Sequence, residues 1–328
     1  LQADAANYLG DGNADITGDS THDGGSGVVG RFTPFDFSIT LDNVPLLTPG
    51  CSAAFTYLDQ PFNYATAPSV TITARNALAN TTNNYDGAWW KLADFSETYT
   101  NNGAPLNVDD TLAGHVAIDC SADTCDGAFT TSFSGPLTFV RAGSETAPFG
   151  GLIDISFSIS DGEASYASNP FTVDDIDFSG GNNEQRWGRL AVGEEVGSEL
   201  MILNVPLSAE YYDGAAYILN SDDNCTAFTL ATHVDLSSMA SGTQGGDQPM
   251  VIGSGTTSVT SGNPTLVNGS AMFTFTAPGA DNKGIVDIEA DLTAANMGML
   301  LSDWDGDGNF DNHPAGRATF GIISRPKE

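Results

Sequence analysis

The chain has 328 residues, of which 42 are acidic and 10 are Lys or Arg, so its formal net charge is −32. Such a surface repels phosphate backbones and anionic membranes, which excludes nucleic acid as a partner. Because 40% of the residues are hydrophobic, the charge must coat a folded body, with length enough for two domains. Two interpretations fit this composition: a secreted protein in a cation-rich medium, or a halophilic protein.

Residues 1–29 are rich in Gly, Asp and Asn and are predicted to form a flexible polar leader. A calcium loop presents oxygen ligands at positions 1, 3, 5 and 9, and this segment offers them as Asp11, Asn13, Asp15 and Asp19. Position 6 is Ile16 rather than glycine, so this is the weaker of two candidate calcium sites. The start at Leu1 shows no signal peptide, which indicates a processed chain or a fragment of something longer.

Residues 30–178 are predicted to form a first all-β domain. Apolar and polar residues alternate with period two at 35–41, 70–74 and 152–159, so each of these segments is expected to bury one face. Turn-forming residues such as those of 83–87 lie between the predicted strands, without a helical period. The pattern is typical of an antiparallel β-sandwich of immunoglobulin-like type with long loops.

A Gly- and Asn-rich stretch at 179–183 marks the predicted boundary, and 179–328 is predicted to form a second β-sandwich domain. Its predicted strands are 189–192, 200–207, 216–219, 271–276 and 285–288. Residues 237–268, dominated by Ser, Gly and Thr, read as a long loop with at most one strand. A helical turn is expected only at 291–299. No uninterrupted apolar run of about 18 residues occurs, so no membrane span is predicted.

The four cysteines predict two disulfides and an oxidising exterior. Cys120 and Cys125 bracket a loop short enough to close locally, and elimination leaves Cys51 with Cys225. A pair spaced CxxxxC without a neighbouring histidine is a poor zinc signal.

The strongest metal motif lies near the end of the chain, at 303–311. The motif places carboxylates at positions 1, 3, 5 and 9, glycine at position 6 and a free backbone carbonyl at position 7, and the candidate ligands are Asp303, Asp305, Asp307, Asn309 and Asp311, with Gly308 as the glycine. This order and the close spacing of the acids suit a hard cation, because four carboxylates in nine residues would repel one another without one. No bidentate Glu follows at position 12, so this is not a helical EF-hand. We expect a Ca²⁺ loop that caps a β-structure.

The sequence offers little for catalysis, and we expect no enzyme. The four histidines stand alone, and no GxSxG elbow or phosphate-binding glycine loop occurs. Acid pairs such as Asp109 and Asp110 keep a carbohydrate-active enzyme as a remote alternative. Because basic residues are scarce, several arginines are expected to be buried ion-pair anchors: Arg31, Arg75, Arg186, Arg189 and Arg317.

Several segments together resemble, in order, the uncharacterised C-terminal region of the MshQ-type proteins linked to the mannose-sensitive haemagglutinin (MSHA) type IV pilus. The segments that carry the resemblance are Val29-Gly30-Arg31-Phe32-Thr33-Pro34, Phe55-Thr56-Tyr57, Thr73-Ala74-Arg75-Asn76, Asn84-Tyr85-Asp86-Gly87, Arg186-Trp187-Gly188-Arg189-Leu190, Gly197-Ser198-Glu199-Leu200, Val205-Pro206-Leu207, Tyr211-Tyr212-Asp213-Gly214, Asp222-Asp223-Asn224-Cys225-Thr226, 303–311 and Arg317-Ala318-Thr319-Phe320-Gly321. The resemblance runs from about residue 28 to 323. Relatives are usually much longer, so the chain is expected either to have lost upstream domains or to be a self-sufficient subunit.

The resemblance implies an extracellular, pilus-associated or cell-surface β-protein, an adhesin among the options, without assigned enzymatic activity. It supplies no ligand-binding residues. Our first hypothesis is therefore a calcium-stabilised structural or adhesive module of a pilus or other surface appendage, with appendage subunits or surface glycans as partners. The alternative is a self-polymerising filament subunit, in which the leader or an edge strand of one copy pairs with the next.

Overall fold

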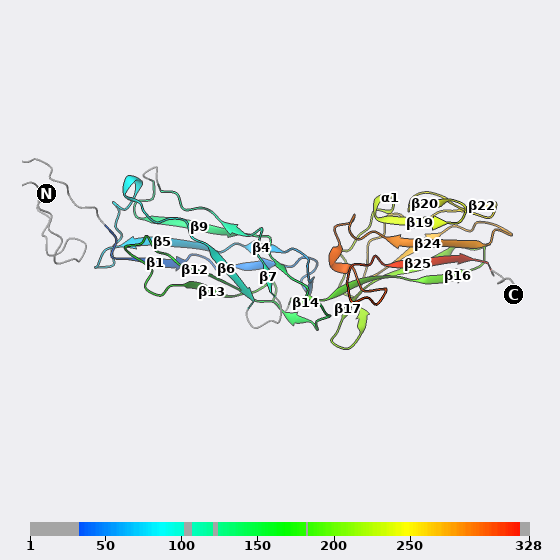
Figure 1. Cartoon of the computed structure of the whole chain (residues 1–328), viewed down its shortest axis with the longest axis horizontal. Coiled ribbons are helices and arrows are strands. Elements are labelled where there is room, and N and C mark those ends of the chain that lie inside the picture. The colour runs from blue at the N-terminus through cyan, green and yellow to red at the C-terminus, as the bar shows by residue number, and fades with distance from the viewer. Residues whose placement is uncertain (1–32, 102–106, 121–123, 182, 322–328) are drawn as a thin grey trace, which may run out of the picture. The chain divides into compact units, whose positions relative to one another are not determined.

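The computed structural model describes residues 33–101, 107–120, 124–181 and 183–321 (Figure 1). The chain divides into two compact units. Unit 1 comprises Leu1–Thr48, Asn63–Leu137 and Leu152–Ser179, and unit 2 comprises Pro49–Phe62, Thr138–Gly151 and Gly180–Glu328. The predicted boundary at 179 is the last of the points where the chain passes between the units. Two segments of the predicted first domain, 49–62 and 138–151, pack in unit 2. The predicted leader lies outside the described residues.

Unit 1 contains two main antiparallel sheets. The first has the strand order β1 (Asp36–Leu41), β5 (Ser69–Arg75), β9 (Ala128–Ser134) and β8 (Gly114–His115), and the second has the order β13 (Phe171–Ile176), β12 (Ile153–Phe157) and β6 (Glu97–Asn101). The strands β2 (Leu46–Thr48) and β4 (Asn63–Thr66) form a separate pair, and the unit also holds β7 (Val108–Asp109) and the 3-10 turn η2 (Gly87–Trp89).

The core of unit 1 follows from the alternation in its sequence. Every second residue of β5 is buried, and β12 shows the same pattern, so each strand turns one face inward. The two sheets meet through these faces, because the rings of Phe133 on β9 and Phe157 on β12 lie 5.6 Å apart. Sheet-on-sheet packing of this kind is the β-sandwich predicted from the sequence.

Unit 2 also contains two main sheets. One consists of β15 (Gly188–Val192), β17 (Leu203–Tyr212), β18 (Tyr217–Leu219) and β23 (Ser270–Phe275), and the other has the order β16 (Glu194–Gly197), β25 (Ala315–Phe320), β24 (Gly284–Ala290), β19 (Val234–Ser238) and β20 (Gly242–Gly245). The sheets are antiparallel except that β16 pairs with β25 in parallel. Their inner faces share one core, in which Phe275 packs edge-on against Phe320 at 6.4 Å.

A small sheet in unit 2 joins three distant segments. Its strands are β11 (Phe149–Gly150), β14 (Glu184–Arg186) and β3 (Phe55–Tyr57), and β14 pairs with β3 in parallel. Further elements of this unit are β10 (Thr138–Phe139), the pair β21 (Met250–Ile252) and β22 (Gly255–Thr257), α1 (Leu230–His233) and the 3-10 turn η3 (Gly298–Leu300). The segment 49–62 thereby brings Phe55 and Tyr57 into the core of unit 2.

The all-β prediction is confirmed, and two local predictions are wrong. Residues 237–268 are not a long loop, because β20, β21 and β22 form there through backbone pairing. A helical turn does form at 291–299, where the N–H of Ala295 bonds to the carbonyl of Asp291 and η3 begins, but the expectation that it would be the only one is wrong, because α1 also forms.

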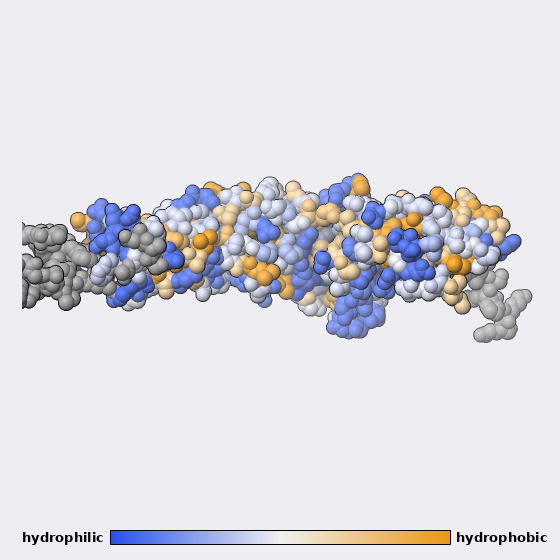
Figure 2. All heavy atoms as spheres, turned by 90° about the horizontal axis from the view of Figure 1, so that it is seen from above, coloured by the Kyte–Doolittle hydropathy of each residue, from blue (hydrophilic) through white to orange (hydrophobic). Residues whose placement is uncertain are grey.

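The surface is predominantly polar, in keeping with the charge of the chain. On the face drawn in Figure 2, hydrophilic residues cover much of the surface and apolar residues are scattered among them. Across the described residues, no helix is both long and apolar enough to cross a membrane.

Candidate metal-binding loop and its supporting clusters

The acidic loop 303–311 projects from unit 2 between η3 and β25. A bridge between Ser302 and Asn312 closes its base, with backbone hydrogen bonds in both directions. The side-chain oxygen of Asn312 also accepts hydrogen bonds from the backbone N–H groups of Trp304 and Asp305, at 2.9 and 3.4 Å. The loop is therefore fastened at its entrance by Asn312, a residue that the calcium pattern does not include.

Asp303 organises the interior of the loop. Its Oδ1 accepts backbone hydrogen bonds from Gly306 at 2.7 Å and Asp307 at 3.0 Å, and its Oδ2 accepts one from Gly308 at 3.0 Å. Gly306 and Gly308 have φ angles of +76° and +90°, which glycine adopts without steric cost. These two glycines let the backbone wrap around the first carboxylate.

Three of the five predicted ligands come together in this loop. Carboxylate oxygens of Asp303, Asp305 and Asp307 lie within 4.8 Å of one another. Asn309 donates its side-chain amide to Asp307 at 2.9 Å, and Asp311 does not belong to the three-carboxylate cluster. The backbone N–H and the side chain of Asn309 hold the pKa of the Asp307 carboxyl below its usual value. Asp307 is therefore favoured in its charged form, and the cluster presents the hard oxygen donors that Ca²⁺ prefers.

Two aromatic contacts attach the loop to the body of unit 2. The ring of Trp304 lies under the guanidinium of Arg189, 4.6 Å from its carbon to the ring centroid. Phe310 packs edge-on against the buried Trp187 at 4.8 Å. The aromatic residues that alternate with the acids thus anchor the loop, while its carboxylates stay exposed or half-buried.

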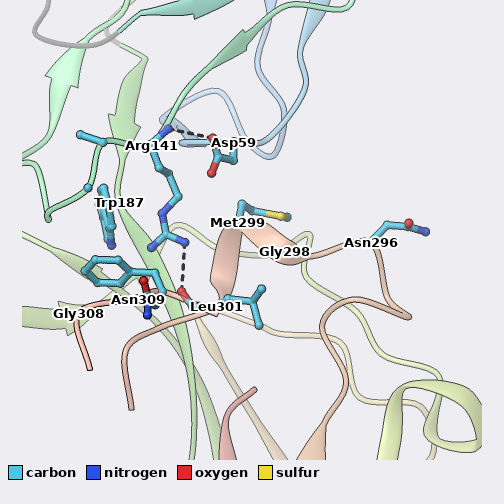
Figure 3. A pocket seen from close by; sticks show the side chains of 12 residues that line it. Asp59, Arg141, Trp187, Asn296, Gly298, Met299, Leu301, Gly308 and Asn309 are labelled. Atoms are coloured by element: carbon cyan, nitrogen blue, oxygen red, sulfur yellow. Dashed lines mark hydrogen bonds between the residues drawn. The ribbon is translucent and has the colours of Figure 1, made fainter. Parts of the chain in front are cut away.

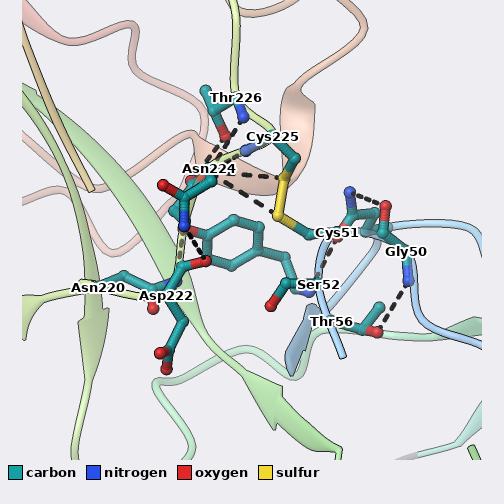
Figure 4. Close-up of a disulfide and its surroundings, with 12 residues drawn as sticks. Gly50, Cys51, Ser52, Thr56, Asn220, Asp222, Asn224, Cys225 and Thr226 are labelled. Atoms are coloured by element: carbon teal, nitrogen blue, oxygen red, sulfur yellow. Dashed lines mark hydrogen bonds between the residues drawn. A yellow bond between two sulfur atoms is a disulfide. The ribbon is translucent and has the colours of Figure 1, made fainter. Parts of the chain in front are cut away.

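The structure joins Cys51 to Cys225 and Cys120 to Cys125, the pairs predicted from the sequence. Figure 4 shows the first of these disulfides beside a polar cluster. At its centre the fully buried Asp223 accepts hydrogen bonds from the backbone N–H groups of Cys225 and Thr226, both at 3.0 Å. The hydroxyl of Thr226 donates to the same carboxylate at 2.7 Å.

The polar cluster continues to the predicted ion-pair anchor Arg186. This guanidinium pairs with Glu184 at 2.7 Å and with Asp222 at 2.8 Å, and it donates to the buried side chain of Asn220. The amide of Asn220 in turn donates to the hydroxyl of Tyr57 at 2.7 Å. Because each polar group has a partner, the cluster can be buried without a large desolvation cost.

The other disulfide, in unit 1, also has a buried aspartate beside it. Asp86 accepts backbone hydrogen bonds from Gly87 at 2.8 Å and from Cys125 and Asp126, both at 2.7 Å. Burial raises the pKa of this carboxyl, but the backbone donors outweigh burial and lower it. Both disulfides are thus stabilised by a carboxylate that the sequence reasoning missed. The sequence places Asp223 two residues before Cys225, which hints at the first contact. It gives no such hint for Asp86, which lies far along the chain from Cys120 and Cys125.

A histidine that stands alone in the sequence has two acidic partners in unit 1. The Nδ1 of His115 lies 2.7 Å from Glu97, its Nε2 lies 2.8 Å from Asp94, and its ring stacks on Phe95 with 4.0 Å between centroids. Both ring nitrogens therefore face carboxylates, which leaves neither of them free to act as a base. We interpret the role of His115 as structural, because it links Glu97 and Asp94 through its two ring nitrogens.

The described arginines form the predicted ion pairs, but the expected burial is found only at Arg186, because Arg75 and Arg189 are half-buried and Arg317 is exposed. Arg75 pairs with Asp36 at 2.6 Å, Arg189 with Glu210 at 2.7 Å and Arg317 with Asp287 at 2.6 Å, in addition to Arg186. Arg31 and the weaker calcium candidate at 11–19 lie outside the described residues. Sequence reasoning did not single out Arg141, which is half-buried in unit 2 and stacks on Trp187.

These observations define a class: an all-β protein of tandem units with two disulfides, which are compatible with an extracellular or secreted location. Two family models match it, the third domain of DUF6701 over residues 1–182 and the fourth domain of DUF6701 over residues 186–327. The chain therefore belongs to the DUF6701 family. No curated protein matches the chain.

Proposed function

We propose that the chain is an extracellular, calcium-stabilised structural or adhesive module of a pilus or another cell-surface appendage, without catalytic activity of its own. The observation that carries the proposal is the convergence of the Asp303, Asp305 and Asp307 carboxylates in one fastened loop. The two disulfides support a place outside the cell. The pilus part of the proposal is supported by the sequence resemblance alone.

Calcium would act on unit 2 through the position of the loop. The loop leads into β25 (Ala315–Phe320), which pairs with both β24 and β16. Fixing the conformation of the loop should therefore stabilise an interior strand of a five-stranded sheet. Three carboxylates held close together repel one another, and a divalent cation reverses the sign of that interaction. With free ion at ~10 to ~100 times the dissociation constant, binding stabilises the fold by about 1.4 to 2.7 kcal/mol.

The test of the calcium part is thermal unfolding in millimolar calcium and in a chelator. We expect calcium to raise the melting temperature of unit 2 by several degrees. Asp305→Ala should remove most of this shift. Asp213→Ala is the matched control, because Asp213 serves a surface turn by accepting the backbone N–H groups of Ala215 and Ala216. Equal melting temperatures with and without the ion would reject a stabilising cation.

The test of the cellular part is the location of the native protein. Antibody should label intact cells, and the protein should co-purify with appendages sheared from the surface. Recovery of the protein only from the cell interior would contradict the proposal. This outcome is independent of the melting experiment, so the calcium site and the surface role can fail separately.

A further inference from the structure

A cavity of about 590 Å³ opens in unit 2 beside the acidic loop. Its walls include Asp59, Arg141, Trp187, Asn296, Met299 and Asn309. In Figure 3 the side chain of Arg141 extends between Asp59 at one end and Leu301 at the other, with Trp187 beside its guanidinium. The cavity thus combines one cation, one anion, two amides and an aromatic wall, which is the composition of a site for a small polar ligand.

The guanidinium of Arg141 is held in place by two hydrogen bonds, which occupy only part of its hydrogen-bonding capacity. Its Nη1 donates to the carbonyl of Leu301 at 3.1 Å and its Nη2 donates to the carbonyl of Gly188 at 3.3 Å. The guanidinium carbon lies 4.1 Å from the ring centroid of Trp187. A guanidinium carries five N–H groups. The remaining groups, including the buried Nε–H, have no partner among the described residues.

Arg141 also lacks a charge partner. Each of the other arginines in the described ranges has a carboxylate within 4.0 Å, whereas Arg141 has none there. Burial lowers the pKa of its guanidinium to about 10, and the charge of Asp59 opposes that shift. The group therefore remains protonated at neutral pH. In a chain with 42 acidic residues, a half-buried cation that borders a cavity and has no carboxylate within 4.0 Å is a place for an external anion.

A second unused donor lines the same cavity. Trp187 is fully buried, and its indole N–H has no hydrogen-bond acceptor in the described part of the chain. Buried polar groups are normally satisfied, so two unsatisfied donors at one cavity are an unusual combination. Both donors are shielded from solvent, so they make the wall of the cavity electropositive without themselves contacting a ligand.

We propose that this cavity is a carboxylate-binding site, in which Arg141 anchors a small monoanionic ligand. The stacking on Trp187 fixes the plane of the guanidinium, as needed for two parallel hydrogen bonds to a carboxylate. Asp59, which accepts the backbone N–H of Arg141 at 2.8 Å, adds a negative charge to the same wall. A doubly charged phosphate is therefore disfavoured. The ligand that fits is a carboxylate with a neighbouring donor for Asp59, found in acidic sugars and in α-amino acids.

The site does not depend on the proposed calcium ion, because Arg141 and Trp187 lie outside the loop 303–311. The experiment is calorimetric titration of the whole chain with four probes: sodium glucuronate, L-alanine, sodium acetate and glucose. We expect glucuronate or alanine to bind saturably and glucose, which has no carboxylate, to give no signal. Binding of glucuronate alone identifies an acidic-sugar site, and binding of alanine alone identifies an amino-acid site.

Variants test the role of Arg141. Arg141→Lys keeps the charge but loses the two-pronged geometry, so the affinity should fall roughly tenfold or more. Arg317→Lys is the matched control, since Arg317 pairs with Asp287 on β24, and it should bind as the unmodified chain does. Asp59→Asn keeps an oxygen for the backbone of Arg141 and removes the nearby charge, so acetate should bind more tightly.

The proposal is overturned if no carboxylate probe binds, if glucose binds as well as glucuronate, or if Arg141→Lys leaves the affinity unchanged. If Arg141→Lys does not fold, Asp59→Asn decides the question. Weaker or unchanged binding of acetate to that variant would then reject Arg141 as the anchor.

Discussion

The phenol of Tyr57 donates a 2.9 Å hydrogen bond to the carboxylate of Asp223, across a sequence separation of 166 residues. Both side chains are fully buried. Burial, and next the charge of Asp223, raise the pKa of the Tyr57 phenol well above its usual value. The phenol therefore stays protonated and remains a donor. This bond and the Cys51–Cys225 disulfide together tie the segment 49–62 to the loop that holds Cys225.

Replacing Asp223 with Ala should destabilise unit 2 strongly. The change leaves the buried hydroxyls of Tyr57 and Thr226 and the buried N–H of Thr226 without an acceptor, and it also removes the acceptor of the Cys225 N–H. Each unsatisfied group costs about 1–3 kcal/mol before relaxation, so we expect a loss of at least about 3 kcal/mol. Tyr57→Phe removes one hydroxyl, which donates to Asp223 and accepts from Asn220, and should cost less, about 1–3 kcal/mol. Urea unfolding gives both values.

Tyr217→Phe is the control for this pair of variants. The Tyr217 hydroxyl contacts Glu145 at 3.4 Å and also hydrogen-bonds to Ser302, so its loss should lower the free energy of unfolding by only about 1 kcal/mol. If Asp223→Ala were no more destabilising than Tyr217→Phe, the buried cluster would not be a source of stability.

The strands of both units were predictable because one-sided burial leaves a period-two signal. In β5 and β12 this signal is complete, and in β24 the last five residues alternate in the same way. The strands β20 to β22 carry no such signal, because each has only three or four residues, and β20 and β22 consist mostly of Gly and Thr. They form through backbone pairing with neighbours that local composition does not reveal.

The site residues also divide into those with a local sequence signal and those brought together by contacts between distant segments. The spacing of Asp303, Asp305 and Asp307 is local, and the sequence predicted it. The partnership of Tyr57 with Asp223 and the stacking of Arg141 on Trp187 depend on segments far apart in the chain. A single sequence read by itself contains no signal for such long-range pairs. Arg141 was also missed because it lies in none of the segments that carry the family resemblance.

The two disulfides should contribute unequally to stability. Cys51 and Cys225 close a loop with a sequence separation of 174, and Cys120 and Cys125 close one of 5. Restriction of the unfolded chain gives about 5 kcal/mol for the long loop and about 2 kcal/mol for the short one. We therefore expect the double alanine variant of the first pair to lose more stability than that of the second. Calorimetry under non-reducing conditions measures both losses.

The disulfides lie in different units, so each loss is read from the unfolding of the unit that holds the pair. Reduction of the unmodified chain provides a check that introduces no cavity, because it breaks the same bonds without removing side-chain atoms. A loss from the short loop equal to that from the long one would contradict the chain-entropy explanation.

Asp86 should make unit 1 sensitive to acid. Its carboxylate accepts three backbone hydrogen bonds of 2.7–2.8 Å, and its pKa in the folded chain is lowered. A lowered folded pKa gives stability that is present above the unfolded value of about 3.9 and is lost as the pH falls through the folded pKa. Asp86→Asn cannot ionise, so it should lose about 1–3 kcal/mol near neutral pH and show a flatter acid dependence.

Melting of unit 1 between about pH 6 and pH 2 measures both effects, with the exposed Asp174→Asn as the control in the same unit. If Asp86→Asn and the unmodified chain lost stability in parallel as the pH fell, the acid sensitivity would have to come from other carboxylates.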